Sequence, residues 1–332
     1  MALKNIRLKE REYLCLTNSG YMQKVIKAIF LFVSMLGVSN TLLAQDTTST
    51  DDDGPKKTKM RKGFQVGFQV GTCLANKYTA ALYNGYGLDV YGNQNTFPNS
   101  LMYQQIVNVY GGANGYGTDR IAQALNVAPG TWGFGQQDMP YNIKYNIAFT
   151  AGGQMRYAVT TRDAILVNAN TARISITGDF TIETTPPATS NSFQNTTNIQ
   201  AFPIIGSEQR TTIQIGYQHI FGDDDSRVGF FMEGGLNINL DKMMTNQLNI
   251  NGLIIDLKAA YAAEFSNYSA LSSKRISGVG FGGFLGAGMN INISPKWLVQ
   301  LVYNPSFDKI NIGADPKFTF QNALSLRGYY CF

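Results

Sequence analysis

Charged residues are scarce in this chain of 332 residues. Asp, Glu, Lys and Arg together make up 15 % of it, whereas 44 % of the residues are hydrophobic. Soluble proteins carry about 25 % charged residues. The shortage of charge suits a protein that is partly dissolved in lipid, and the apolar content leaves no lack of core material.

Histidine and cysteine are nearly absent. His219 is the single histidine, and there are three cysteines, Cys15, Cys73 and Cys331. A general base needs a nucleophile or carboxylate within hydrogen-bond reach, and one histidine with two distant cysteines cannot build a zinc site. We therefore expect no catalytic residue, no bound metal and no cofactor, and we predict that the protein is not an enzyme. His219 is expected at headgroup level on an outward face.

A long apolar run is also missing. Between Met22 and Gln45 a lysine-bearing start leads into an apolar run from Ile29 to Val38 and a small residue, Ala44. This order predicts a secretory signal peptide, residues 1–44 with an upstream extension, because a membrane-spanning helix needs roughly 20 apolar residues. Residues 45–62 read as a disordered periplasmic tether.

The net charge of +5 belongs mainly to this presequence. Six of the 27 basic residues and two of the 22 acidic ones fall within residues 1–44, which leaves 21 against 20 for the rest. A nearly neutral remainder offers no basic footprint for nucleic acid, so we expect no nucleic-acid partner.

What the chain has in abundance is alternation. In GFQVGFQVGT, residues 63–72, Phe64, Val66, Phe68 and Val70 alternate with glycine and glutamine, which predicts a strand with one apolar and one polar face. The pattern recurs seven times. The apolar faces expected there are Tyr141 to Phe149, Ala172 to Ile182, Ile213 to Phe221, Val228 to Leu240, Val279 to Ile291, Trp297 to Tyr303 and Leu324 to Phe332.

The connections between these segments alternate in length. Short turns are expected at 160–163 or alternatively 168–171, at 222–226 and at 294–296, while 74–140, 184–209, 242–275 and 306–319 are long. Short turns at one end of a sheet and long loops at the other are typical of outer-membrane barrels. The lipid itself demands closure, because an open sheet edge would leave unpaired backbone groups in hydrocarbon.

The chain ends on LSLRGYYCF, an alternating strand that finishes in Phe332. Here the sequence resembles the bacterial outer-membrane β-barrel proteins, and its strand number resembles the small OmpA and OmpX class, apart from a far larger first loop. The resemblance implies an all-β, closed, antiparallel, up-and-down barrel of eight strands over residues 63–332, contact with outer-membrane lipid, and recognition of Phe332 by the barrel-assembly machinery. An even strand number places both termini in the periplasm.

The polar faces would line the barrel. Glu233 and Arg327, with Arg173, are expected as lumenal charges that either pair as a plug or are solvated separately by trapped water. GVGFGG, residues 278–283, has nucleotide-loop spacing but lies in an alternating strand, so these glycines are expected to line the narrow interior and to leave unusual space there. Trp297, Tyr330 and Phe332 are expected as interfacial aromatics.

Cys73 and Cys331 fall at opposite ends of their strands, too far apart for a disulfide.

Two long loops carry the expected function. Loop 74–140 holds two helical patterns, with caps expected at Ser100 and Thr118, and Leu253 to Phe265 in loop 242–275 reads as a helix or as a hairpin that would give ten strands. Apolar loop residues outside a membrane indicate a partner. We therefore expect a scaffold or binding protein, or a subunit of an envelope assembly; the alternative is a small-solute channel.

Overall fold

The structure is a computed structural model that describes residues 62–89, 93–112, 117–185, 197–222, 226–259, 276–312 and 317–332. The expected signal peptide and nearly all of the expected tether lie outside these residues. No helix in the described ranges is long and apolar enough to cross a membrane.

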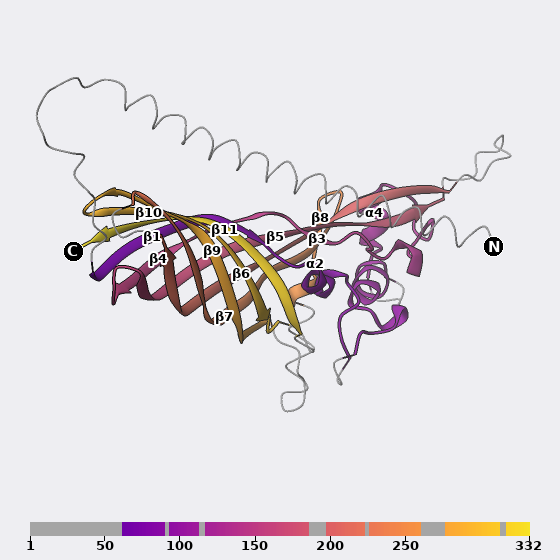
Figure 1. Ribbon diagram of the computed structural model, residues 1–332. Coiled ribbons are helices and arrows are strands. Elements are labelled where there is room, and N and C mark those ends of the chain that lie inside the picture. Colours follow the sequence, from indigo (N-terminus) through magenta and orange to yellow (C-terminus); the bar gives the residue numbers. More distant parts are fainter. Residues whose placement is uncertain are drawn as a thin grey trace, which may run out of the picture. The chain divides into compact units, whose positions relative to one another are not determined.

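Eight strands close into an antiparallel barrel (Figure 1). Each pairs with its neighbours in the chain, and β1 closes the ring by pairing with β11, with Gln69 opposite Arg327. The predicted eight-stranded, up-and-down fold is therefore confirmed. The strands are β1 (Gly63–Leu74), β4 (Ala148–Ala158), β5 (Asp163–Thr184), β6 (Asn198–Phe221), β7 (Val228–Ile250), β9 (Ser277–Ser294), β10 (Trp297–Lys309) and β11 (Phe318–Cys331).

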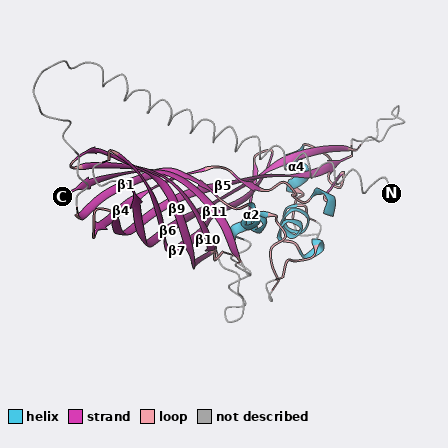
Figure 2. Cartoon of the chain, viewed as in Figure 1, coloured by secondary structure: helices cyan, strands magenta, loops and turns pink. Residues whose placement is uncertain are grey.

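Short connections join β4 to β5, β6 to β7 and β9 to β10 at one end of the ring. The first of them lies at 159–162, which decides for the first of the two expected turn positions. Both ends of the described chain lie at this same end, where the Phe332 amide donates to the Phe64 carbonyl at 3.4 Å. The helices of the described residues gather at the opposite end (Figure 2).

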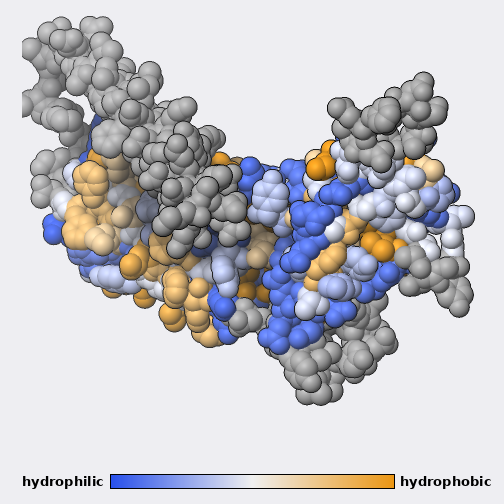
Figure 3. Space-filling model, turned by 90° about the vertical axis from the view of Figure 1, so that its right-hand side faces the viewer, coloured by the Kyte–Doolittle hydropathy of each residue, from blue (hydrophilic) through white to orange (hydrophobic). Residues whose placement is uncertain are grey.

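Below the helices, apolar side chains face outward around the ring. Leu236 is 71 % exposed and Phe230 63 % exposed, while Glu233 and Asn237 of the same strand are buried. Hydrophobic and hydrophilic side chains form separate patches on the face drawn in Figure 3. An apolar outer belt around a polar interior is the arrangement of a barrel in lipid. We call this belt-bearing part of the eight strands the ring.

The ring ends before β5, β6 and β7 do. Beyond Thr171 on β5 the outward residues are polar or charged, and the expected lipid-facing residues point inward instead: Ile174, Ile176, Phe180 and Ile182 are all buried. The expectation that these residues face lipid was wrong, because β5 has 22 residues and is longer than the apolar layer of a membrane is thick. The apolar face of its upper half packs under the helices.

The second strand was also misplaced. It runs over Ala148–Ala158 rather than through Tyr141, and Ile143 and Tyr145 pack against buried residues of the upper sheet. The described residues between 75 and 147 instead form, together with the upper ends of β5, β6 and β7, a separate layer that we call the cap. It also contains β8 (Leu253–Asp256), a hairpin partner of β7, so the ring keeps eight strands rather than ten.

Short elements make up the rest of the cap. Ser100 caps the helix that begins at Leu101, as expected, and Asp119 caps α4 where Thr118 was expected, accepting from the Ala122 amide at 2.8 Å. The segment 260–275 lies outside the described residues. The elements are α2 (Lys77–Ala80), η1 (Ala81–Tyr83), η2 (Phe97–Asn99), α3 (Leu101–Tyr103), η3 (Gln104–Tyr110), α4 (Arg120–Leu125), β2 (Trp132–Gly133), η4 (Gln136–Asp138) and β3 (Lys144–Tyr145).

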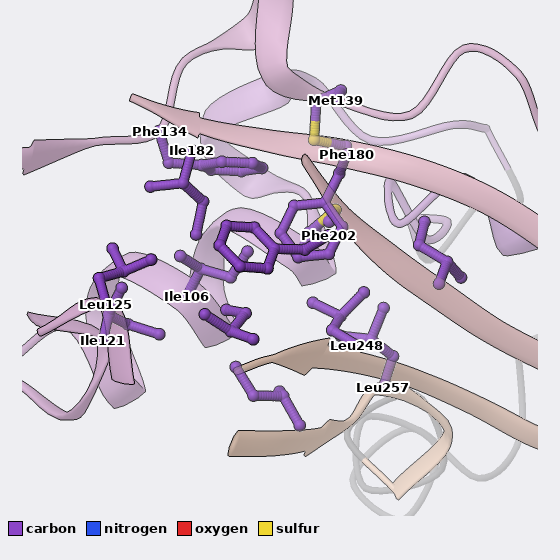
Figure 4. Close-up of a cluster of buried hydrophobic side chains, with 14 residues drawn as sticks. Ile106, Ile121, Leu125, Phe134, Met139, Phe180, Ile182, Phe202, Leu248 and Leu257 are labelled. Atoms are coloured by element: carbon purple, nitrogen blue, oxygen red, sulfur yellow. The ribbon is translucent and has the colours of Figure 1, made fainter. Parts of the chain in front are cut away.

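The cap has a hydrophobic core of its own (Figure 4). Ile106, Ile121 and Leu125 from its helices face Phe180 of β5, Phe202 of β6 and Leu248 of β7. Burying each such side chain contributes about 1.5–3 kcal/mol. The long strands therefore carry the cap as a packed layer rather than as loose loops.

Candidate functional site: a lumen closed by two ion-pair layers

The structure brings Glu233 and Arg327 together in the middle of the ring. Arg327 donates from Nη1 to Glu233 Oε2 at 2.6 Å and from Nη2 to Oε1 at 2.8 Å, and both side chains are fully buried. The Gln218 and Asn304 amides also donate to the carboxylate, at 3.1 and 3.3 Å. A two-pronged pair with its remaining lone pairs occupied is the arrangement that a buried charge requires.

Arg173 does not join this pair. Its side chain is exposed on the outer face of β5, between the buried Ala172 and Ile174, so the expectation of a lumenal Arg173 was wrong. The reversed face of upper β5 is the cause. Gln69 of β1 accepts from Arg327 Nε at 3.0 Å.

Sequence reasoning missed Arg156, the second buried cation of the lower lumen. It donates to Gln218 and Gln65, both at 2.8 Å. Arg156 was not predicted, because the expected second strand lies upstream of it in the sequence. The signal was present in QMRYA, where Gln154 and Arg156 alternate with Met155 and Tyr157.

A second ion pair lies higher, where the ring meets the cap. Arg210 Nε donates to Glu208 Oε1 at 2.6 Å, and Arg210 Nη2 contacts the hydroxyls of Thr79 and Tyr145 at 3.1 and 3.2 Å. The Tyr83 hydroxyl of η1 donates to Glu208 Oε2 at 3.3 Å. Three cap residues thus bond to one buried pair on β6, so the cap and the barrel mouth are tied by charge-assisted hydrogen bonds.

Burial raises the pKa of the Tyr83 phenol well above its ordinary value, and the neighbouring Glu208 carboxylate raises it further. Tyr83 therefore remains a proton donor to Glu208 through neutral and moderately alkaline pH. Glu208 falls in the expected loop 184–209, and Arg210 precedes the first residue of the next expected apolar face, Ile213, so neither was predicted as a lumenal charge. Their shared inward parity with Gln214 and Gln218 could have revealed them.

Between the two ion pairs lies a polar cavity of about 80 Å³. Gln69 and Asn304, which bond to the lower pair, form part of its wall, and Arg210 and Gln321 form another part. Asp308 lies between them and accepts from the Asn237 amide at 2.9 Å. A polar-lined cavity of this size has room for a few water molecules.

The glycines of β9 do not widen this space. A Cβ atom at Gly286 would lie 2.6 Å from Glu233 Cγ, at Gly288 it would lie 2.7 Å from the Phe231 ring, and at Gly282 2.2 Å from Asp308 Oδ1. Bulky neighbours already occupy the volume that the glycines leave. The glycines line the interior as expected, but the expected extra space is not there.

Near the short-turn end, His219 Nδ1 lies 2.7 Å from Asp163 Oδ1, and Tyr217 also donates to Asp163. This group faces outward. Trp297, Tyr330 and Phe332 lie at the same end, with ring centroids 5.3 and 5.2 Å apart in successive pairs.

No disulfide joins Cys73 to Cys331, as expected. Within the described part of the chain, no three His, Cys, Asp or Glu side chains gather as metal ligands.

Comparison with known proteins supports the fold alone. No protein-family model and no curated protein sequence matches the chain. Among solved structures it is similar to Neisserial surface protein A (9 % identity, 82 % of this chain and 98 % of that one, TM-score 0.36) and to OprG of Pseudomonas aeruginosa (8 %, 83 % and 98 %, 0.37). It is also similar to Ail, the attachment invasion locus protein of Yersinia pestis (8 %, 82 % and 100 %, 0.30).

The closed ring and its apolar outer belt define a class. The protein is a small, eight-stranded, membrane-spanning β-barrel of the kind found in bacterial outer membranes. A packed cap lies above the ring.

Proposed function

We propose that the protein is a non-enzymatic, membrane-anchored scaffold that holds its cap outside the cell and binds a protein partner there, as a subunit of an envelope assembly. The observation that carries the proposal is the cap itself. Its core joins four helical or loop segments to three strands that extend past the lipid belt. A packed layer presents its surface side chains in fixed positions, which reduces the ordering entropy lost on binding.

The surface of the cap supplies suitable contact residues. Tyr141 is 90 % exposed, and Val109 and Tyr78 are exposed as well. Tyrosine offers a large, amphipathic contact area with few rotatable bonds. An exposed apolar residue such as Val109 on a layer outside lipid is consistent with a partner surface.

The side chains that fill the lumen argue against the alternative function, a small-solute channel. The polar lining of the lumen favours a channel, but two buried ion pairs and the inserted Tyr83 lie across the path. Side chains ordinarily fill the interior of an eight-stranded barrel.

In this proposal both termini face the periplasm. The short turns and both described chain ends share one end of the ring, and outer-membrane barrels keep short turns in the periplasm. Phe332, exposed at the end of β11, is then available to the barrel-assembly machinery.

Site-specific photo-crosslinking in cells tests the binding role. We expect a photoreactive residue at Tyr141 or Val109 to yield a discrete protein adduct, because both side chains project from the cap. The control is Phe230, which is 63 % exposed but lies on the lipid-facing side of the ring. Adducts from Phe230 alone, or none from either cap position at native expression, would count against a cap-mediated partner.

Planar-bilayer recording separates the scaffold from the channel. A purified chain that acts as a scaffold should be electrically silent. Stable conductance steps from the wild-type protein would favour the channel instead.

A further inference from the structure

We propose that Arg173 and Lys242 form a binding site for the phosphate group of an anionic lipid in the membrane leaflet on the cap side. This goes beyond a general contact with lipid because it assigns a headgroup site to particular side chains.

Strand register places the two cations together. Arg173 of β5 lies opposite Gln209 of β6, and Gln209 lies opposite Lys242 of β7, which in turn lies opposite Ser277 of β9. All four are exposed on the outer face of the barrel. Four adjacent strands thus present one row of a guanidinium, an amide, an ammonium and a hydroxyl.

The row sits where the apolar belt stops. The next outward residues toward the short-turn end are Thr171, Thr211, Leu240 and Val279. Leu240 and Val279 are exposed, and beside Arg173 on β4 lies Phe149, also exposed. A lipid whose acyl chains lie along this belt would bring its phosphate to the level of the row.

The charge around the row is of one sign. Along the outer face of β5 the nearest acidic residue beyond Arg173 is Asp179, six positions away, and its carboxylate accepts from the Asn142 amide. Asp241, next to Lys242, is buried and faces inward. Within the described residues neither Arg173 nor Lys242 forms an ion pair or a side-chain hydrogen bond.

The geometry suits a single phosphate. Neighbouring strands are about 4.8 Å apart, so the Cα atoms of Arg173 and Lys242, two strands apart, are separated by about 10 Å. Both long side chains can reach a group placed between them, with the Gln209 amide as a third donor. Guanidinium groups bind phosphate oxygens in a two-pronged manner, and lysine adds a point charge.

Basic residues also lie at the cap-side ends of other strands. Lys77 follows the end of β1, and Lys309 ends the outward column of β10. Arg173 and Lys242 are singled out because only two strand spacings and an amide separate them.

The opposite rim supplies a matched control. Arg227 precedes β7 and Lys296 precedes β10, both exposed, at the short-turn end of the ring. Replacing them by glutamine removes the same charge as replacing Arg173 and Lys242, but at the other membrane face.

The test uses the full chain folded in phosphatidylcholine vesicles with an increasing mole fraction of phosphatidic acid. Stabilisation against heat is followed by gel mobility, which also shows that each variant has folded. We expect Arg173→Gln and Lys242→Gln each to raise the half-saturating mole fraction about fivefold, and the double variant about thirtyfold, from about 1 kcal/mol per cation near an anionic surface. Arg227→Gln/Lys296→Gln should shift it less than about twofold, because the proposed site is at the other face.

Three results would overturn the proposal. The first is a double variant that saturates like the wild type. The second is an equal loss in the control double variant, which would show a general surface-charge effect. The third is the same stabilisation by inorganic phosphate without anionic lipid, which would assign the row to a free anion. If the double variant does not fold, Lys242→Gln alone decides, with Lys242→Arg expected to restore binding.

Discussion

The ring and the cap are built from the same strands with their faces exchanged. Along β6, Ile215 and Tyr217 face outward in the ring and Gln214 and Gln218 face inward; further up, Phe202 and Ile204 are buried on the inner face. A strand has no preference of its own for either arrangement, since its side chains simply alternate. The medium decides, because lipid covers the outside of the ring and water covers the outside of the cap.

The difference teaches how to read amphipathic strands longer than a membrane. An apolar face shows that something apolar covers it, and only its length shows whether that cover is lipid throughout. On β5 the outward face is apolar at Ile165 and Val167, while the inward face changes from Asn168 and Asn170 to apolar residues from Ala172 upward. One strand thus meets two solvents, and the exchange marks the membrane boundary.

The largest expected effect comes from the charged interior of the ring. Glu233→Ala leaves Arg327 buried without its counter-charge, which costs about 3–5 kcal/mol. Urea unfolding in lipid vesicles measures it, and the double variant Glu233→Gln/Arg327→Gln should recover most of the loss because no buried charge remains. A single variant as stable as the wild type would mean that water already solvates the two groups separately. Conductance should remain absent, since the pair of Glu208 and Arg210 still lies across the lumen.

A comparable change in the cap should act locally. Phe180→Ala removes a buried ring from the cap core, a change that costs about 3–5 kcal/mol where the site cannot collapse. We expect faster proteolysis within residues 75–147 with unchanged heat-dependent gel mobility of the ring. Phe281→Ala, on the lipid-facing side of β9, is the control and should leave the cap resistant. Loss of the folded ring band with Phe180→Ala would show that ring and cap unfold as one unit.

Two arginine substitutions on one face of β6 test the membrane boundary. Ile215→Arg places a charge in the lipid belt and should cost about 2–4 kcal/mol at mid-depth, falling toward the rims. Ala201→Arg, on the same face but in the cap, should change stability by less than about 0.5 kcal/mol, because it meets water. Equal costs in urea unfolding would refute two different solvents along this strand.

The smallest effect concerns the bond between cap and ring. Tyr83→Phe removes one hydrogen bond to the Glu208 carboxylate and should cost about 1–2 kcal/mol, since Arg210 and Tyr145 still hold the carboxylate. The loss is expected in the cap, measured as faster proteolysis there.

The raised pKa of Tyr83 also predicts a pH dependence. Above a pH of about 10 an unfolded Tyr83 loses its proton while the folded one keeps it, so the folded state binds more protons and stability falls as pH rises. Proteolysis of the wild-type cap should therefore accelerate at alkaline pH more than that of Tyr83→Phe. Parallel curves for the two proteins would remove Tyr83 as the cause.

Most of the fold could be predicted from the sequence. Eight alternating segments, trimmed turns at one end and long connections at the other indicated the closed barrel, and they placed Glu233 and Arg327 on inward faces. Contact between these two residues could not be derived, because they come from β7 and β11, and only the closed ring sets the distance across its lumen. The ion pair of Glu208 and Arg210 was not predicted, because the sequence pattern indicates a loop where the upper part of β6 lies.

The errors on β4 and β5 have one physical origin. Choosing the more apolar face as the lipid-facing one assumes a single environment along the whole strand. Tyr145 and Ile176 belong to apolar faces, but the cap covers them. The assumption fails wherever a barrel strand continues into a second folded layer.

By itself, the sequence determined that the strands alternate, that they close, and that charge is kept out of the outer belt, because each of these follows from local side-chain order and from the cost of unpaired groups in lipid. Only the tertiary structure decided which medium covers each apolar face, which charges meet across the lumen, and that the cap inserts Tyr83 beside Glu208. The contact between Glu233 and Arg327 joins residues 94 positions apart, and that between Tyr83 and Glu208 joins residues 125 positions apart. Their proximity depends on ring closure and on the height at which each strand leaves the membrane.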